Sequence, residues 1–168
     1  MAESRSVYLV VGGGVAEGPN PGLTVPAREE AVATADLLPP KPPAVICGTG
    51  QRHEDLAKAL GLTPTYWTPT IGTPEKFRRG AGTEKVVLGH GTIISRHEYA
   101  SPEDRSVGVW ALLNGLPDGS VVVTSRGTTK GVLGLDHSSQ TTVIRIWLNG
   151  ENRMADYRIF NLMDDPTT

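Results

Sequence analysis

The sequence predicts an α/β fold: a mostly parallel central sheet between two layers of helices, with an antiparallel pair of strands at one edge. Short apolar, β-branched runs that lead into glycine, at residues 6–11, 44–50 and 120–127, are typical of strands buried on both faces. Helical segments follow the first two runs, so the first half has the order strand, helix, strand, helix. That order is the pattern of a parallel α/β sheet.

Both helices of the first half carry end signals. The first is expected over residues 26–38, with Thr24 as its N-cap, because small or apolar side chains recur at spacings of three and four: Ala27, Ala31, Ala35 and Leu38. The second is expected over residues 51–62 and is closed by Gly61.

The second half is more varied. A short strand is expected around Tyr66 and Trp67, and residues 86–94 predict a β-hairpin that turns at Gly89-His90-Gly91. Ser101 is a good cap for a third helix that runs to about Asn114. The runs at 142–148 and 157–162 alternate as an antiparallel edge pair does, with a turn at 149–152 between them.

Composition limits the function classes. The 168 residues suit one domain over 1–168, and 38% hydrophobic with 20% charged residues is ordinary for a globular protein. A net charge of -2 without any basic run predicts no bulk nucleic-acid binding, so an anion site would be local.

Compartment and cofactors follow from what the sequence contains. Cys47 is alone, which excludes an intramolecular disulfide and suits a reducing compartment. With neither a signal-like start nor about 20 consecutive apolar residues, we expect a cytoplasmic chain without membrane contact. The four histidines have no metal-ligand spacing, so neither a metal nor another cofactor is predicted.

Gly12, Gly13 and Gly14 end the first strand and form a candidate anion site. Exposed backbone N–H groups beside a helix N-terminus can hold a phosphate, although a glycine-rich turn without a ligand explains the same residues. The spacing departs from the dinucleotide fingerprint, because Gly18 stands one position too far along the chain.

Three segments, in this order, resemble motifs of the histidine phosphatase superfamily in its phosphoglycerate mutase-like branch. VYLV followed by Val11-Gly12-Gly13 is similar to the strand that ends in Arg-His-Gly, and residues 23–31 are similar to the opening of the next helix. Residues 47–57 resemble the second motif and keep its arginine as Arg52. The strand that ends in Ser125-Arg126-Gly127 is similar to the one that ends in Ser-His-Gly.

The resemblance implies the family's fold with an altered site. In the family, the histidine of the first motif takes up a phosphoryl group, and arginines with a second histidine stabilise the transferring oxygens. The matching positions here are Gly12 for the nucleophile, Val11 for its neighbouring arginine and Arg126 for the second histidine. Glycine has no side chain to phosphorylate, so the resemblance implies a catalytically silent member.

Arg52 and Arg126 are expected at one cleft, where two guanidinium groups could clamp a phosphate or carboxylate. The alternative is that each pairs with a nearby acid, such as Glu54 or Asp55 for Arg52. His53 could face the same cleft and bind the ligand or act as a substitute catalytic group.

Three functions follow from these residues. The first is a silent phosphatase-like domain that binds an anionic small molecule or a protein partner through Gly12, Gly13, Arg52, His53 and Arg126. The second is a phosphate-ester hydrolase with a relocated catalytic residue, and the third is a scaffolding subunit. The sequence leaves the oligomeric state open.

Overall fold

The computed structural model describes residues 5–14, 22–68, 71, 85–87, 93–95, 102–138, 140–149 and 154–161. Six strands form the main sheet in the order β3-β2-β6-β1-β7-β8. Their bounds are Tyr66–Thr68 (β3), Val45–Gly48 (β2), Val121–Thr124 (β6), Arg5–Val11 (β1), Thr142–Leu148 (β7) and Met154–Asn161 (β8). β4 (Lys85–Val87) and β5 (Ile93–Ser95) form a separate antiparallel pair.

The centre of the main sheet is parallel and its last two strands are antiparallel, as predicted. β1 pairs in parallel with β6, which pairs in parallel with β2, and β2 does the same with β3. On the other side of β1, β7 runs antiparallel from Arg5 opposite Leu148 to Val11 opposite Thr142. β8 then pairs antiparallel with β7.

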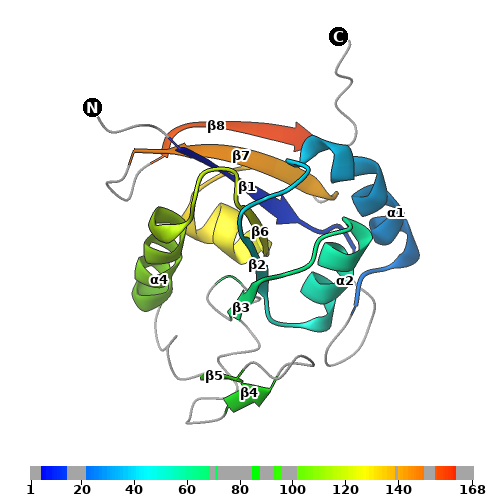
Figure 1. The fold of residues 1–168 in the computed structure, drawn as a ribbon, viewed down its shortest axis with the longest axis horizontal. Helices are drawn as coiled ribbons and strands as arrows, with labels where there is room; N and C mark the ends of the chain where they lie inside the picture. Colours follow the sequence, from blue (N-terminus) through cyan, green and yellow to red (C-terminus); the bar gives the residue numbers. More distant parts are fainter. Residues whose placement is uncertain are drawn as a thin grey trace.

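Helices cover both faces of this sheet (Figure 1). On one face lie α4 (Pro102–Gly115) and η4, a single π-helical stretch (Gly127–Val132), and on the other lie α1 (Val25–Thr34) and α2 (Gln51–Ala59). Each face has its own apolar cluster: Leu9 and Ile144 pack with Val109 and Leu113 of α4, whereas Val10 packs with residues of α1 and α2. The predicted three-layer α/β/α fold is therefore confirmed.

Local signals in the sequence placed these elements well. Thr24 caps α1, because its Oγ1 accepts from the backbone N–H of Ala27 at 3.3 Å. Helix α1 ends at Thr34, earlier than predicted, and a 3-10 turn, η1 (Ala35–Leu37), continues it. Gly61 follows α2 with φ at +74°, a backbone conformation that glycine adopts without strain.

Some expected features lie outside the described residues. These are the hairpin turn at 89–91, the cap at Ser101 and residues 150–153 of the last turn. Within the described part of the chain, no helix is both long and apolar enough to span a membrane.

Candidate functional site

The predicted site residues lie where the parallel strands end. Gly12 directly follows β1, Arg52 is in the first turn of α2 after β2, and Arg126 follows β6 by two residues. Because β7 is antiparallel to β1, with Thr142 opposite Val11, the segment before β7 reaches the same edge. The fold thus brings four chain segments together at the edge where open α/β sheets bind ligands.

Gly12 is closely packed by apolar side chains. A Cβ added at this position would lie 3.0 Å from Leu23 Cδ2 and 3.4 Å from Leu56 Cδ2. Both leucines are buried, at 4% and 1% exposure. A side chain at position 12 would therefore have to displace part of the apolar cluster between α1, α2 and the sheet.

Gly13 is buried beside the carboxylate of Glu30, which was not among the predicted site residues. The Oε1 atom of Glu30, on α1, accepts from the Thr141 backbone N–H at 3.4 Å and from Thr141 Oγ1 at 3.2 Å. A Cβ on Gly13 would lie only 2.6 Å from that oxygen. The missing side chain at position 13 thus lets Glu30 connect α1 to the segment before β7.

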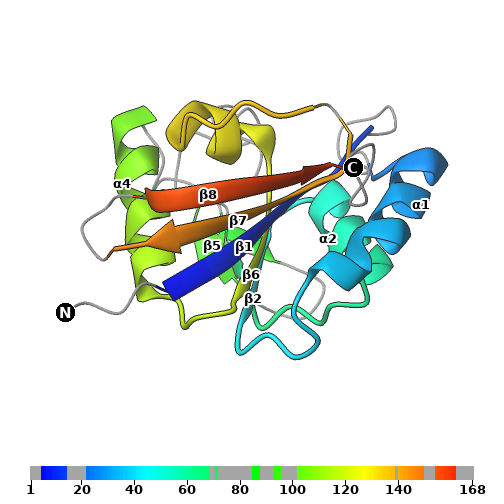
Figure 2. The ribbon, with the colours of Figure 1, turned by 90° about the horizontal axis from the view of Figure 1, so that it is seen from above.

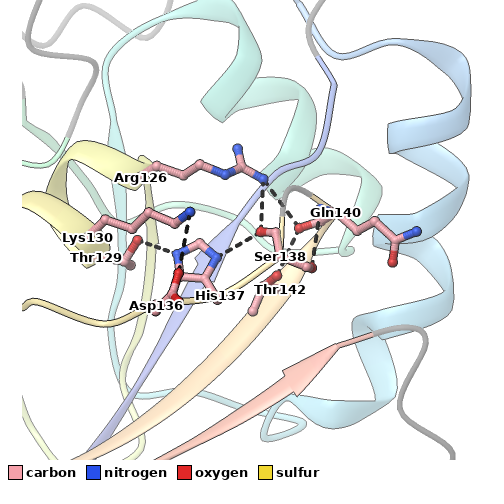
Figure 3. A network of polar contacts seen from close by, with 8 residues as sticks. All are labelled: Arg126, Thr129, Lys130, Asp136, His137, Ser138, Gln140 and Thr142. Atoms are coloured by element: carbon pink, nitrogen blue, oxygen red, sulfur yellow. Dashed lines mark hydrogen bonds and ion pairs between the residues drawn. The ribbon is translucent and has the colours of Figure 1, made fainter.

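Arg126 reaches across the edge of the sheet to main-chain carbonyls, two of which, of Ser138 and Gln140, are drawn in Figure 3. Its Nη1 donates to the carbonyl of Gly12 at 3.1 Å, and its Nη2 donates to those of Ser138 and Gln140 at 3.5 and 3.4 Å. Its Nε is buried and has no hydrogen-bond acceptor within the described part of the chain. The guanidinium group therefore joins the end of β1 to the segment before β7 and keeps one buried donor unused.

Arg126 shares this region with a second cation and one carboxylate. Burial lowers the pKa of Arg126, the positive charge of Arg52 lowers it further, and the negative charge of Glu30 opposes both effects. An arginine remains protonated in proteins even when its pKa falls, so both guanidinium groups stay charged. The positive charge of Arg52 and the negative charge of Glu30 therefore both act on Arg126.

A buried threonine and histidine support the loop that Arg126 contacts (Figure 3). His137 Nδ1 donates to the carbonyl of Ser138 at 3.0 Å, so its Nε2, 2.7 Å from Thr129 Oγ1, is the acceptor of the threonine hydroxyl. Thr129 and His137 are 0% and 8% exposed.

Burial also lowers the pKa of His137, and the charges of Arg126 and Lys130 add to this effect. The hydrogen bond to Ser138 and the charge of Asp136 oppose it. We therefore take His137 as neutral near pH 7, held in one tautomer. No local spacing in the sequence indicated its contact with Thr129, which lies eight positions away in η4.

The remaining candidates near α2 are more enclosed. His53 is 2% exposed on the side of α2 that faces the sheet. Asp55 accepts from the backbone N–H of Leu23 and forms an ion pair with Arg28, each at 3.0 Å. This carboxylate thus links α2 to α1.

Two further groups limit the chemistry of this edge. Burial, with a smaller effect from Glu54, raises the pKa of Cys47, so its thiol is protonated and is a poor nucleophile. Thr49, after β2, is 4% exposed, and its Oγ1 has no hydrogen-bond partner within the described residues. The same part of the chain holds no group of His, Cys, Asp and Glu placed to bind a metal ion.

Comparisons with known proteins agree with this architecture. The structure is similar to that of the protein histidine phosphatase SixA complexed with tungstate, at 12% identity and a TM-score of 0.64, over 93% of this chain and 96% of that one. It is also similar to a protein named SixA from Nakamurella multipartitia, at 12% identity and a TM-score of 0.56, over 96% and 98% of the two chains. A third similar structure is the product of an open reading frame of Mycobacterium tuberculosis, at 20% identity and a TM-score of 0.54, over 83% and 90%.

Sequence comparison adds no assignment. No protein-family profile matches the chain, and no curated protein matches it. At these identities the structural likeness establishes the fold, which is that of the histidine phosphatases, and the function has to be argued from the site.

Proposed function

We propose that this chain is a catalytically silent histidine phosphatase-like domain that binds a phosphorylated or otherwise anionic ligand at the carboxyl edge of its sheet. The observation that carries the proposal is the Arg126 guanidinium group after β6: its Nε is buried without an acceptor within the described residues, and the positive charge of Arg52 acts on it. An anion bound there would accept hydrogen bonds and offset the positive charge of Arg126.

The surroundings of Arg126 support binding. Its guanidinium group is held by backbone carbonyls, so little side-chain freedom would be lost when a ligand arrives. Gly12 lies at the same strand end, and its carbonyl is one of the acceptors that hold Arg126. SixA, which has a similar fold, was crystallised with tungstate, a tetrahedral oxyanion.

The absence of a nucleophile at position 12 supports a silent domain. Glycine offers no atom to accept a phosphoryl group, and Leu23 and Leu56 pack against it. An arginine at position 126 keeps a positive charge but, unlike histidine, cannot carry a proton back and forth near pH 7. These features favour binding over turnover.

Two alternatives make different predictions. A hydrolase with a relocated catalytic group would release the alcohol from a generic aryl phosphate, and His53→Ala would abolish that release if His53 were the group. A scaffolding subunit would show neither turnover nor binding of small anions.

The test is thermal unfolding of the full chain in increasing concentrations of inorganic phosphate. A ligand that binds only the native state stabilises it by RT ln(1 + [L]/Kd), about 1.4 kcal/mol at ten times the Kd. For a chain of this length we expect the midpoint to rise by about 3–6 °C. Arg52→Ala should remove most of this rise.

Lys58→Ala is the matched control, because it removes one positive charge from an exposed position on the same helix, α2. We expect it to keep the phosphate-dependent rise. A wild-type chain without any rise at millimolar phosphate, or equal rises in Arg52→Ala and wild type, would refute the anion site.

A further inference from the structure

β8 is an edge strand whose outer side is unpaired within the described part of the chain. It is the last strand of the main sheet, runs from Met154 to Asn161 and pairs with β7 alone. Figure 2 looks onto this edge, with β8 in front of β7 and β1. An edge of this length presents main-chain donors and acceptors that can pair with another strand.

The sheet places two positive charges directly opposite one another beside this edge. Arg145 of β7 faces Arg158 of β8. The first guanidinium group lies 4.7 Å from the ring centre of Trp147, and the second lies 4.9 Å from that of Phe160. Within the described residues, neither arginine forms an ion pair.

Like charges directly opposite one another destabilise a sheet, and contacts with aromatic rings offset this only in part. A carboxylate placed on the outer side of Arg158 would neutralise the pair. A partner strand must therefore present an acidic side chain opposite Arg158, on the same face of the sheet.

We infer that β8 pairs antiparallel with β8 of a second copy of this chain, with Tyr157 on the two-fold axis. In this register Asp156 faces Arg158 of the second copy, and Arg158 faces Asp156 of the second copy. The register shift between Trp147 and Leu148 turns Met154 to the face of the sheet opposite Phe160, so the regular pairing is centred on Asp156–Arg158. The strand is thus complementary to itself in charge about its central tyrosine.

The charges also select this register. Centring the pair on Asp156 would place two carboxylates opposite each other, and centring it on Arg158 would do the same with two guanidinium groups. Only the axis at Tyr157 forms two opposite-charge pairs. It also places two tyrosines side by side, and aromatic cross-strand pairs stabilise sheets.

The exposed state of the strand fits such a partner. Tyr157 is 51% exposed, and its backbone N–H donates to the carboxylate of its own neighbour, Asp156, at 2.8 Å. On pairing, the Asp156 carboxylate can turn to Arg158 of the second copy. The result would be a continuous sheet across two copies, which goes beyond the ligand site proposed above and does not depend on it.

The test is the oligomeric state of the full chain, measured by sedimentation across a range of micromolar concentrations. We expect the wild type to form a dimer. Asp156→Arg and Arg158→Asp each replace two opposite-charge pairs by two like-charge pairs, so each should raise the dimer dissociation constant at least about tenfold. The double variant with both changes restores opposite charges and should dimerise again.

A second measurement addresses the axis itself. Tyr157→Cys should form a disulfide between copies under mild oxidation, because directly paired residues bring their Cα atoms to about 4.5–5.5 Å. Tyr66→Cys is the control, since Tyr66 is also 51% exposed and lies on β3, the opposite edge strand. A monomeric wild type, failure of the double variant to recover, or equal cross-linking of the two cysteine variants would overturn the inference.

Discussion

The turns that follow β1 and β6 end neighbouring parallel strands, yet they are built in opposite ways. After β1, Gly12 and Gly13 have no side chains, and the space beside them is taken by Leu23, Leu56 and Glu30. After β6, Arg126 extends a long cationic side chain to the carbonyl of Gly12. Neighbouring side chains pack against the turn after β1, whereas the Arg126 side chain of the turn after β6 extends to the β1 turn.

The two turns differ in two features that a phosphatase site needs together. Phosphoryl transfer needs a nucleophile and also positive charge around the transferring oxygens. The β1 turn offers no nucleophile, whereas Arg126 and Arg52 supply positive charge. Positive charge beside a position 12 that has no side chain suits binding, which is the basis of the function proposed above.

Gly12→His is expected to reduce the stability of the chain most, because it changes the closely packed turn after β1. Its Cβ alone would lie 3.0 Å from Leu23 Cδ2 and 3.4 Å from Leu56 Cδ2, and we expect a loss of about 3 kcal/mol of unfolding free energy, the upper end of the usual cost of overpacking. Urea unfolding measures this loss. Gly115→Ala is the control, because nothing lies within 4 Å of a Cβ at Gly115, and it should not destabilise the chain. Equal stabilities of Gly12→His and wild type would show that the turn is not closely packed.

Gly13→Ala tests the contact between the turn after β1 and Glu30. A Cβ at this position meets Glu30 Oε1 at 2.6 Å, so the carboxylate must shift, and weakening its hydrogen bonds to Thr141 should cost about 1 kcal/mol. The cost should shrink when Glu30→Ala is already present, which gives a coupling of about 1 kcal/mol in a double-mutant cycle. Glu29→Ala, an exposed change on the same helix, should leave the cost unchanged. Additive effects of Gly13→Ala and Glu30→Ala would contradict the contact.

The smallest effect concerns the loop that Arg126 contacts, through the pH dependence of stability. The pKa of His137 is lowered in the folded state, so the unfolded chain takes up this proton first as the pH falls. Neutral His137 therefore stabilises the fold at pH values above about 6.5, the pKa of a histidine in the unfolded chain. This stabilisation is lost as the pH falls from there toward the lower pKa of the folded state. Urea unfolding at pH 7.5 and 5.5 should show a smaller decline for His137→Gln than for wild type. An equal decline would mean that His137 is not held neutral.

The sequence predicted the parts of this molecule that depend on neighbouring residues. Thr24 was recognised as a cap, and the glycines after the buried strands marked where β1 and β2 end, because these are local signals. Arg52 and Arg126 follow strands of one parallel sheet, and their shared anion site at that edge stays a prediction.

What the sequence could not predict depends on contacts between distant segments. Glu30 meets Thr141 across 111 positions, and Leu56 of α2 packs beside Gly12 at the end of β1. Thr129 of η4 contacts His137, which lies beyond the end of that element. Such pairs follow from tertiary packing, which leaves no trace in local spacing.

The proposed silent anion site is tested most directly by titrating the full chain with p-nitrophenyl phosphate while heat and nitrophenolate absorbance are recorded together. It predicts saturable binding that Arg52→Ala weakens, with no release of nitrophenolate. Sustained release beyond one equivalent per chain would establish an enzyme and contradict the proposed silent site, and the absence of saturable heat would contradict binding.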